Sequence, residues 1–261
     1  FVAGVVVVAI LLGKSPMTLF AGLGATSAVL MLVFKDTILG LAAGVRLTSN
    51  DMLHKGDWIT VKSVDANGIV EDMSLTTVKV RNFDNTIVTI SPATLVNGSF
   101  QNWIGMQKSG GRRVKRIVYF DFRSIRLIDE TLKQTLLAKH FATEDSFKLK
   151  ESLQKAIEKD IEEGKDIEDL KNPAALAPTN LQLYRRFMEK YLRQRPEVNT
   201  ELTLMVRHME ATQCGLPIEF YFFIKDKVWV NYEHILADIM EHAYALANEF
   251  GLKIYEQYPE Q

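Results

Sequence analysis

The side chains that could perform catalysis or hold a metal ion are few and widely spaced in this 261-residue sequence. Its one cysteine, Cys214, excludes an intrachain disulfide and a thiolate zinc cluster, and His208, six residues earlier, would pair with it only by accident of folding. No phosphate-binding loop, nucleophile elbow or zinc-protease motif occurs. No tight ligand spacing connects the five histidines, which are His54, His140, His208, His234 and His242. The sequence therefore predicts a protein that is not an enzyme, with no catalytic residue, metal or cofactor.

Charge is balanced over the sequence but almost absent from its N-terminal part. Lys and Arg number 31 and Asp and Glu number 32, which argues against a nucleic-acid partner bound by bulk charge. Between residues 1 and 34 the only formal charge is Lys14, and residues 15–34 have no ionisable side chain. At about 1.5 Å per residue, this stretch matches the roughly 30 Å hydrocarbon core of a bilayer and predicts a transmembrane helix.

The shorter uncharged run, residues 1–13, is expected to be the end of another transmembrane helix that begins before the sequence given. A signal peptide is the alternative, but a positive n-region and an A-x-A cleavage site are both absent. One positive charge, Lys14, precedes the second apolar run, and Lys35, Arg46 and Lys55 follow it. By the positive-inside rule, we expect the large C-terminal part to be cytoplasmic.

The second apolar run is unusual for a helix that faces lipid, because small residues crowd it between positions 20 and 29. Ala21 and Ala25, like Gly24 and Ala28, are four residues apart, a spacing that lets helix backbones approach closely. Either two helices of one subunit pack together, or identical helices surround a symmetry axis. The second interpretation is favoured because small residues cover most of the helix circumference.

A pair of opposite charges, Lys35 and Asp36, ends the apolar run, and a short amphipathic segment with Gly40 and Gly44 follows. This order favours a bend near residues 35–37 and a second half-helix along the membrane interface. A straight helix that emerges into the cytoplasm is the alternative.

The rest of the sequence predicts a small Sm-like β-barrel domain over residues 51–103 and an α+β domain over residues 104–261. In the first domain, strands are expected at 58–62, 68–73, 76–82 and 86–90, with turns at Asn67-Gly68 and Asp84-Asn85 and a linker at 102–111. In the second, strands are expected at 114–122, 201–209 and 220–224, and helices at 125–139, 181–192 and 232–250. The charge-rich segment 144–169 is expected to be helical and solvated, within an insertion at about 144–192.

The densest basic run of the sequence opens the α+β domain. It is either the solvated beginning of a strand or a basic rim that biases which ions approach a cavity. The vestibule candidates are Arg112, Arg113, Lys115 and Arg116.

This order of parts resembles the small-conductance mechanosensitive channel (MscS) family, and short motifs agree with it. They are Leu23-Gly24-Ala25, Leu41-Ala42-Ala43-Gly44-Val45, Lys55-Gly56-Asp57-Trp58-Ile59 and Gly68-Ile69-Val70. The longer body, with Asn97 to Trp103 and the extended α+β domain, looks most like the miniconductance, YbdG-type branch. The resemblance implies a mechanosensitive ion channel of the bacterial inner membrane, opened by tension to release ions and small solutes during hypo-osmotic shock. It also implies a homo-heptamer in contact with membrane lipids.

Carried over to this sequence, the resemblance implies a pore lined by residues 17–34 and an interfacial half-helix at 37–50. The two leucine rings of the family align with Ala28 and Leu32, so we expect the gate at Leu32 with Met31 or Phe34. The family's kink glycine falls on Asp36, and its I-P-N element appears as Ile90 to Ala93. The pore-lining candidates are Ala21, Ala25, Ala28, Met31, Leu32 and Phe34; the kink and helix-packing candidates are Lys35, Asp36, Gly40 and Gly44.

Three other protein classes remain as alternatives. A membrane-anchored oligomeric scaffold whose β-domain binds a partner would be expected to have an ordinary leucine-rich anchor. A membrane enzyme would need a convergent titratable cluster. A secondary transporter would need more membrane spans and charges within them.

Overall fold

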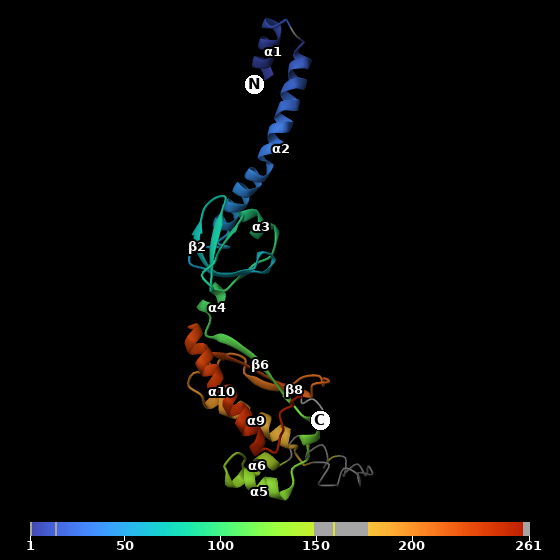
Figure 1. Ribbon diagram of the computed structural model, residues 1–261, viewed down its shortest axis with the longest axis vertical. Helices are drawn as coiled ribbons and strands as arrows, with labels where there is room; N and C mark the ends of the chain where they lie inside the picture. Colours follow the sequence, from blue (N-terminus) through green and yellow to red (C-terminus); the bar gives the residue numbers. More distant parts are fainter. Residues whose placement is uncertain (1, 14, 149–158, 160–176, 258–261) are drawn as a thin grey trace. The chain divides into compact units, whose positions relative to one another are not determined.

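The computed structural model describes residues 2–13, 15–148, 159 and 177–257, in two compact units, Phe1–Gly105 and Met106–Gln261 (Figure 1). Lys14, and with it part of the predicted connector between the apolar runs, lies outside the described residues. So does most of the predicted charge-rich helix at 144–169, of which the structure shows the short helix α6 (Glu144–Phe147).

The first unit begins with two helices, α1 (Val2–Leu11) and α2 (Pro16–Ser49), which pack against each other (Figure 1). Ala9 of α1 is fully buried. The side chain of Ser15 accepts a hydrogen bond from the Thr18 N–H and Pro16 occupies the first turn, so the start of α2 is well capped. Among the described residues, α2 is the one helix long and apolar enough to cross a membrane.

The remainder of this unit is a five-stranded antiparallel sheet with the order β4-β3-β2-β1-β5. Helix α3 (Pro92–Asn97) follows β4 and contacts α2, and helix α4 (Ile104–Lys108) follows β5. The division between the two units, after Gly105, falls within the predicted linker at 102–111, part of which forms α4 and the end of β5. The strands are β1 (Trp58–Val61), β2 (Ala66–Met73), β3 (Val78–Asn82), β4 (Ile87–Ile90) and β5 (Gln101–Asn102).

One of the two predicted turns was wrong. Asn67 and Gly68 lie inside β2, and the chain turns earlier, at the 3₁₀ segment Lys62–Val64 and at Asp65, whose φ is 52°. Gly68 is needed for close strand pairing, since a Cβ there would lie 1.9 Å from the carbonyl oxygen of Arg81 on β3. The turn at Asp84-Asn85 is confirmed, with Asn85 at a φ of 69°.

The second unit is an α+β fold around a three-stranded antiparallel sheet with the order β6-β8-β7. Its strands are β6 (Arg112–Phe120), β7 (Met205–His208) and β8 (Leu216–Ile224); its longer helices are α5 (Glu130–Ala138), α9 (Asn180–Gln194) and α10 (Trp229–Glu249). Alternate side chains of β6, Val114, Val118 and Phe120, share one buried core with residues of α9 and α10. The predicted strand at 114–122 ends two residues early, because Phe122–Ser124 forms a 3₁₀ turn capped by Asp121.

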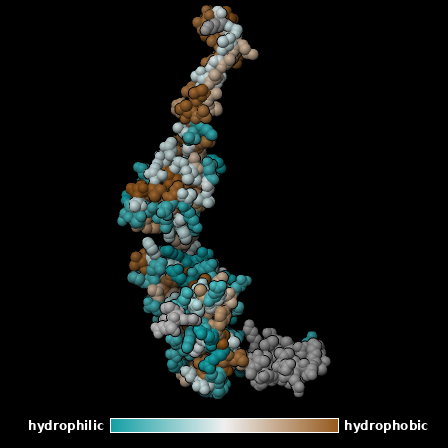
Figure 2. All heavy atoms as spheres, turned by 45° about the vertical axis from the view of Figure 1, so that its right-hand side comes forward, coloured by the Kyte–Doolittle hydropathy of each residue, from teal (hydrophilic) through white to brown (hydrophobic). Residues whose placement is uncertain are grey.

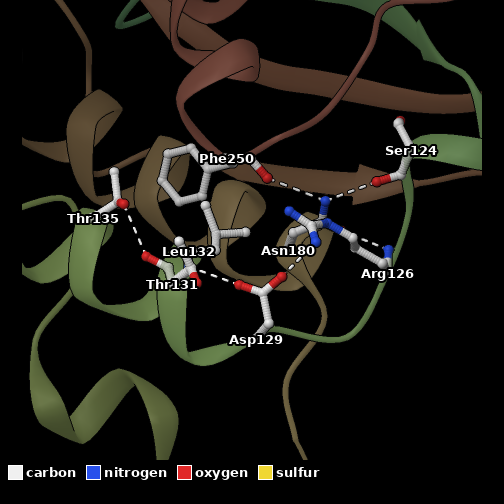
Figure 3. A network of polar contacts seen from close by, with 8 residues as sticks. All are labelled: Ser124, Arg126, Asp129, Thr131, Leu132, Thr135, Asn180 and Phe250. Carbon is white, nitrogen blue, oxygen red and sulfur yellow. Dashed lines mark hydrogen bonds and ion pairs between the residues drawn. The ribbon is translucent and has the colours of Figure 1, made fainter.

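A buried asparagine joins three separate segments of this unit (Figure 3). The side-chain amide of Asn180, fully buried at the start of α9, donates to the carbonyl oxygens of Ser124 and Phe250. Its side-chain oxygen accepts from the N–H groups of Arg126 and Leu181. All donors and acceptors of this amide are thus satisfied, as a buried polar group requires.

Helix α5 begins later than predicted, at Glu130 and not at Ile125, because Asp129 caps it. The Asp129 carboxylate accepts a hydrogen bond from the Leu132 N–H at 2.7 Å and pairs with Arg126 (Figure 3). These contacts, the Leu132 N–H first, lower the pKa of Asp129 below its ordinary value.

Candidate pore helix and its attachment to the β-domain

The N-terminal two-thirds of α2 presents side chains that the unit leaves uncovered. Every residue from 21 to 39 is exposed, and the side chains in this stretch include Leu32 at 73% and Met31 at 71% exposure. Figure 2 shows apolar residues along the helices α1 and α2. Soluble monomers rarely expose so much contiguous apolar surface, so this part of α2 is a candidate for contact with lipid or with other helices.

Four of the six pore-lining candidates share one face of α2. Ala21, Ala25, Ala28 and Leu32 are separated by four, three and four residues, so at about 100° per residue their directions stay within about 60° of one another. The side chains of this stripe are small at three positions and bulky at Leu32. In a ring of such helices with the stripe facing inward, the opening would therefore be narrowest at Leu32.

The other two candidates do not lie on this stripe. Phe34 follows Leu32 by two residues, about 200° of rotation, and so points to the opposite side of the unbroken helix. Met31 lies about 100° from Leu32, on the flank of the stripe. The helix geometry therefore groups Leu32 with Ala28 and not with Phe34.

The charged pair Lys35 and Asp36 does not interrupt the helix. Both residues are helical and exposed, and neither forms an ion pair with another described residue. They follow Leu32 by three and four residues, so they lie on its side of the helix, about one turn further along. The bend at residues 35–37 stays a prediction.

The last turns of α2 are built into the β-domain. Gly40, Ala43, Gly44 and Leu47 are buried, and the fully buried Leu47 belongs to the same core as Leu53, Ile59, Val61, Val70, Val80 and Leu95. A Cβ on Gly44 would lie 2.4 Å from the carbonyl oxygen of Leu75, in the loop between β2 and β3. Because Gly44 has no side chain, α2 can pack directly against the backbone of this loop. By contrast, a Cβ on Gly40 would meet nothing within 4 Å.

The glycine–aspartate motif fixes the segment that connects α2 to β1. Gly56 adopts a φ of 93°, which favours glycine, and its N–H donates to the Val70 carbonyl. The carboxylate of Asp57, only 7% exposed, accepts hydrogen bonds from the His54 N–H at 3.0 Å and from the Asn102 amide at 2.8 Å. The same amide donates to the Met52 carbonyl, so Asn102 ties β5 to the end of the helix.

The four vestibule candidates lie on β6 but do not share a face. Arg112 and Arg116 point to the side of α10, where Arg112 stands 4.3 Å from the centre of the Tyr232 ring and Arg116 pairs with Glu233. Arg113 and Lys115 point to the other side of the sheet, where Lys115 lies 3.6 Å from the buried Glu219. A strand alternates its side chains, so two of these cations lie on each side of the sheet, and their role as a basic rim stays a prediction.

Two residues that hold this site together were missed by the sequence analysis. Leu75 contributes only its backbone carbonyl oxygen, and such a contact cannot be predicted from the type of side chain. Asn102 acts across 45 residues on Asp57, and the sequence gives no signal for this contact beyond the place of Asn102 in the short motif Asn97 to Trp103.

Comparisons with known proteins agree with this arrangement. Residues 36–105 match the family model described as "Mechanosensitive ion channel, beta-domain". A curated relative, the small-conductance mechanosensitive channel MscMJ of Methanocaldococcus jannaschii, is 33% identical over 90 residues, which are 34% of this chain and 25% of MscMJ. The match thus spans about a quarter of the relative's length.

Two solved structures have the same fold. The cryo-EM structure of Arabidopsis thaliana MSL1 aligns with a TM-score of 0.64 and 11% identity, over 98% of this chain and 72% of MSL1. The closed-state crystal structure of Helicobacter pylori MscS aligns with a TM-score of 0.58 and 12% identity, over 96% of this chain and 74% of that chain. An apolar helix, a β-domain and an α+β domain therefore follow one another here in an MscS-like fold, and residues 36–105 are similar to the β-domain of mechanosensitive ion channels.

Proposed function

We propose that this chain forms the pore and the following domains of a mechanosensitive channel of the bacterial inner membrane, opened by membrane tension to release ions and small solutes during hypo-osmotic shock. The observation that carries the proposal is the contrast between the two ends of α2. Its residues 21–39 are exposed on every side, while its end is buried in the β-domain. Such a helix needs both lipid and its own copies.

The proposed gate is the stripe of Ala21, Ala25, Ala28 and Leu32. A narrow ring of apolar side chains excludes water, and therefore ions, without any charged barrier. Lys35 and Asp36 follow on the same side of the helix, where they would keep the pore hydrated just beyond the ring. Tension favours whichever state occupies more membrane area, so it shifts the equilibrium toward a wider, wetted ring.

The attachment of α2 supplies a route from helix to β-domain. Because Gly44 contacts the Leu75 backbone and Leu47 lies inside the β-domain core, the end of the helix cannot tilt without carrying the sheet with it or breaking these contacts. We propose that the β-domain and the last turns of α2 move together on opening, and that the bend lies before Gly40.

The proposed assembly is a homo-heptamer in contact with membrane lipids, with the domains that follow α2 in the cytoplasm. The bias of positive charge after the apolar run supports this orientation. The extended α+β unit is our reason to place the chain in the miniconductance branch.

Patch-clamp recording of the full-length protein, in cells without other such channels, tests the proposal. We expect tension-gated currents, and we expect Leu32→Ser to wet the closed pore and open it at lower suction or spontaneously. Leu30→Ser is the matched control, because Leu30 lies on the opposite face of α2, about 200° from Leu32. Patches that stay silent up to rupture would refute the channel and favour the scaffold. Equal effects of the two serine variants would refute Leu32 as the gate.

A further inference from the structure

The second unit contains a cavity that the channel function does not use. It lies between α9 and the corner that joins α5 to α6, three helices drawn near one another in Figure 1, and its volume is about 330 Å³. This size is at the lower end of the range for small-molecule sites. The residues that argue for a ligand are Arg186 and Lys190 on one side, Phe141 and Phe187 on another, and the hydroxyl groups of Thr143 and Ser146.

Two cations on the wall of this cavity have no anionic partner among the residues that the structure describes. Arg186 and Lys190 are one turn apart on α9, and neither forms an ion pair with a described residue. No Asp or Glu is among the described residues that line the cavity. Elsewhere on the same helix, Arg185 pairs with Glu189 at 3.7 Å across the same spacing. Like charges at this spacing repel each other, so a bound anion would relieve the repulsion.

Aromatic side chains form the apolar part of the cavity. The rings of Phe141 and Phe187 meet edge to face, with their centres 5.3 Å apart. Tyr191, also on the wall, stacks on His242 with ring centres 5.8 Å apart. Rings held in this way offer a fixed surface against which a flat ligand could pack.

We propose that this cavity binds a small organic anion that combines a phosphate with a flat ring, of the nucleoside monophosphate class. Arg186 would hold the phosphate in a bidentate contact, with Lys190 as a second charge. The ring would pack against Phe141 and Phe187, and the sugar would lie beside the Thr143 and Ser146 hydroxyls, which hydrogen-bond each other at 3.2 Å. The inference goes beyond the proposed channel function and does not depend on it.

Calorimetric titration of the purified full chain in detergent with AMP tests this inference. We expect saturable binding. The affinity should fall about tenfold or more when Arg186→Glu and Lys190→Glu are combined, because each substitution removes a positive charge that would contact the phosphate and puts a negative charge in its place. Arg193→Glu is the matched control, because Arg193 is exposed on the same helix and does not line the cavity. It should change the affinity less than about twofold. Circular dichroism of each variant confirms that the fold is retained.

Two further titrations separate the parts of the ligand. Adenosine should bind about tenfold or more weakly than AMP, since it lacks the anion, and inorganic phosphate should also bind more weakly, since it lacks the ring. Absence of saturable AMP binding would overturn the proposal. So would equal affinities for adenosine and AMP, or an equal loss in the Arg193→Glu control. If the double reversal disturbs the fold, the milder pair Arg186→Gln and Lys190→Gln should weaken AMP binding in the same direction, and unchanged binding would overturn the proposal.

Discussion

Adding one methyl group at Gly44 should loosen the joint between the pore helix and the β-domain. In Gly44→Ala, the new Cβ would lie 2.4 Å from the Leu75 carbonyl oxygen, whereas carbon–oxygen contacts in proteins are usually at about 3.3 Å or more. The obstacle is backbone, so the helix or the loop between β2 and β3 must shift by roughly 1 Å. Overpacking of this kind costs about 1–3 kcal/mol.

Gly40→Ala is the matched control for this prediction. Gly40 is one turn earlier on the same buried face, but a Cβ there meets nothing within 4 Å. Both substitutions gain the same helix propensity, about 1 kcal/mol. That gain cancels in the comparison, so the difference between the two variants measures the clash alone. We expect Gly40→Ala to be the more stable by about 1–3 kcal/mol.

The assay is denaturant unfolding of the full chain in detergent, followed by tryptophan fluorescence. Trp58 and Trp103 stack in the β-domain with ring centres 4.7 Å apart and report on this unit, and replacement of Trp229 by Phe removes the signal of the other unit. In patches, Gly44→Ala should also change the opening tension, and Gly40→Ala should change it less. Equal stability of the two variants, within about 0.5 kcal/mol, would refute the claim that the Leu75 contact constrains the helix.

The second unit offers two further predictions. Asn180→Ala leaves the carbonyls of Ser124 and Phe250 buried without donors, so thermal unfolding should show a loss on the order of 3 kcal/mol; a change under about 0.5 kcal/mol would contradict the network. The Leu132 N–H lowers the pKa of Asp129 below 3.8, so its contribution is present above pH 3.8 and is lost as pH falls through the lowered value. The melting temperature advantage of wild type over Asp129→Asn should therefore shrink in acid, and a pH-independent difference would contradict this assignment.

Much of the first unit could be predicted from local signals. The uncharged run and the Ser15-Pro16 start predict where α2 begins, and β-branched runs predict β1 to β4, because both signals lie within the elements they specify. The error at Asn67-Gly68 has a physical cause, since the glycine that permits a tight turn also permits two strands to approach closely. Contacts such as Asp57 with Asn102 join residues 45 positions apart, and no local pattern encodes them.

The grouping of the pore candidates shows a different limit. The gate of Leu32 with Met31 or Phe34 stays a prediction, and the spacing favours Met31 over Phe34, because residues two apart on an unbroken helix point to opposite sides. The resemblance aligned positions along the helix but did not check their direction around it. The split of Arg112, Arg113, Lys115 and Arg116 between two faces of β6 follows from strand alternation in the same way.

The burial of Leu47 in the β-domain core has a consequence for anyone who exchanges parts between related channels. A chimaera that joins a foreign membrane helix at Asn50, where α2 ends, would replace Gly44 and Leu47 with side chains selected for another sheet. A splice placed just before Gly40 instead keeps the buried end of α2 and the β-domain core native. It exchanges only the residues that we propose to contact lipid and neighbouring copies.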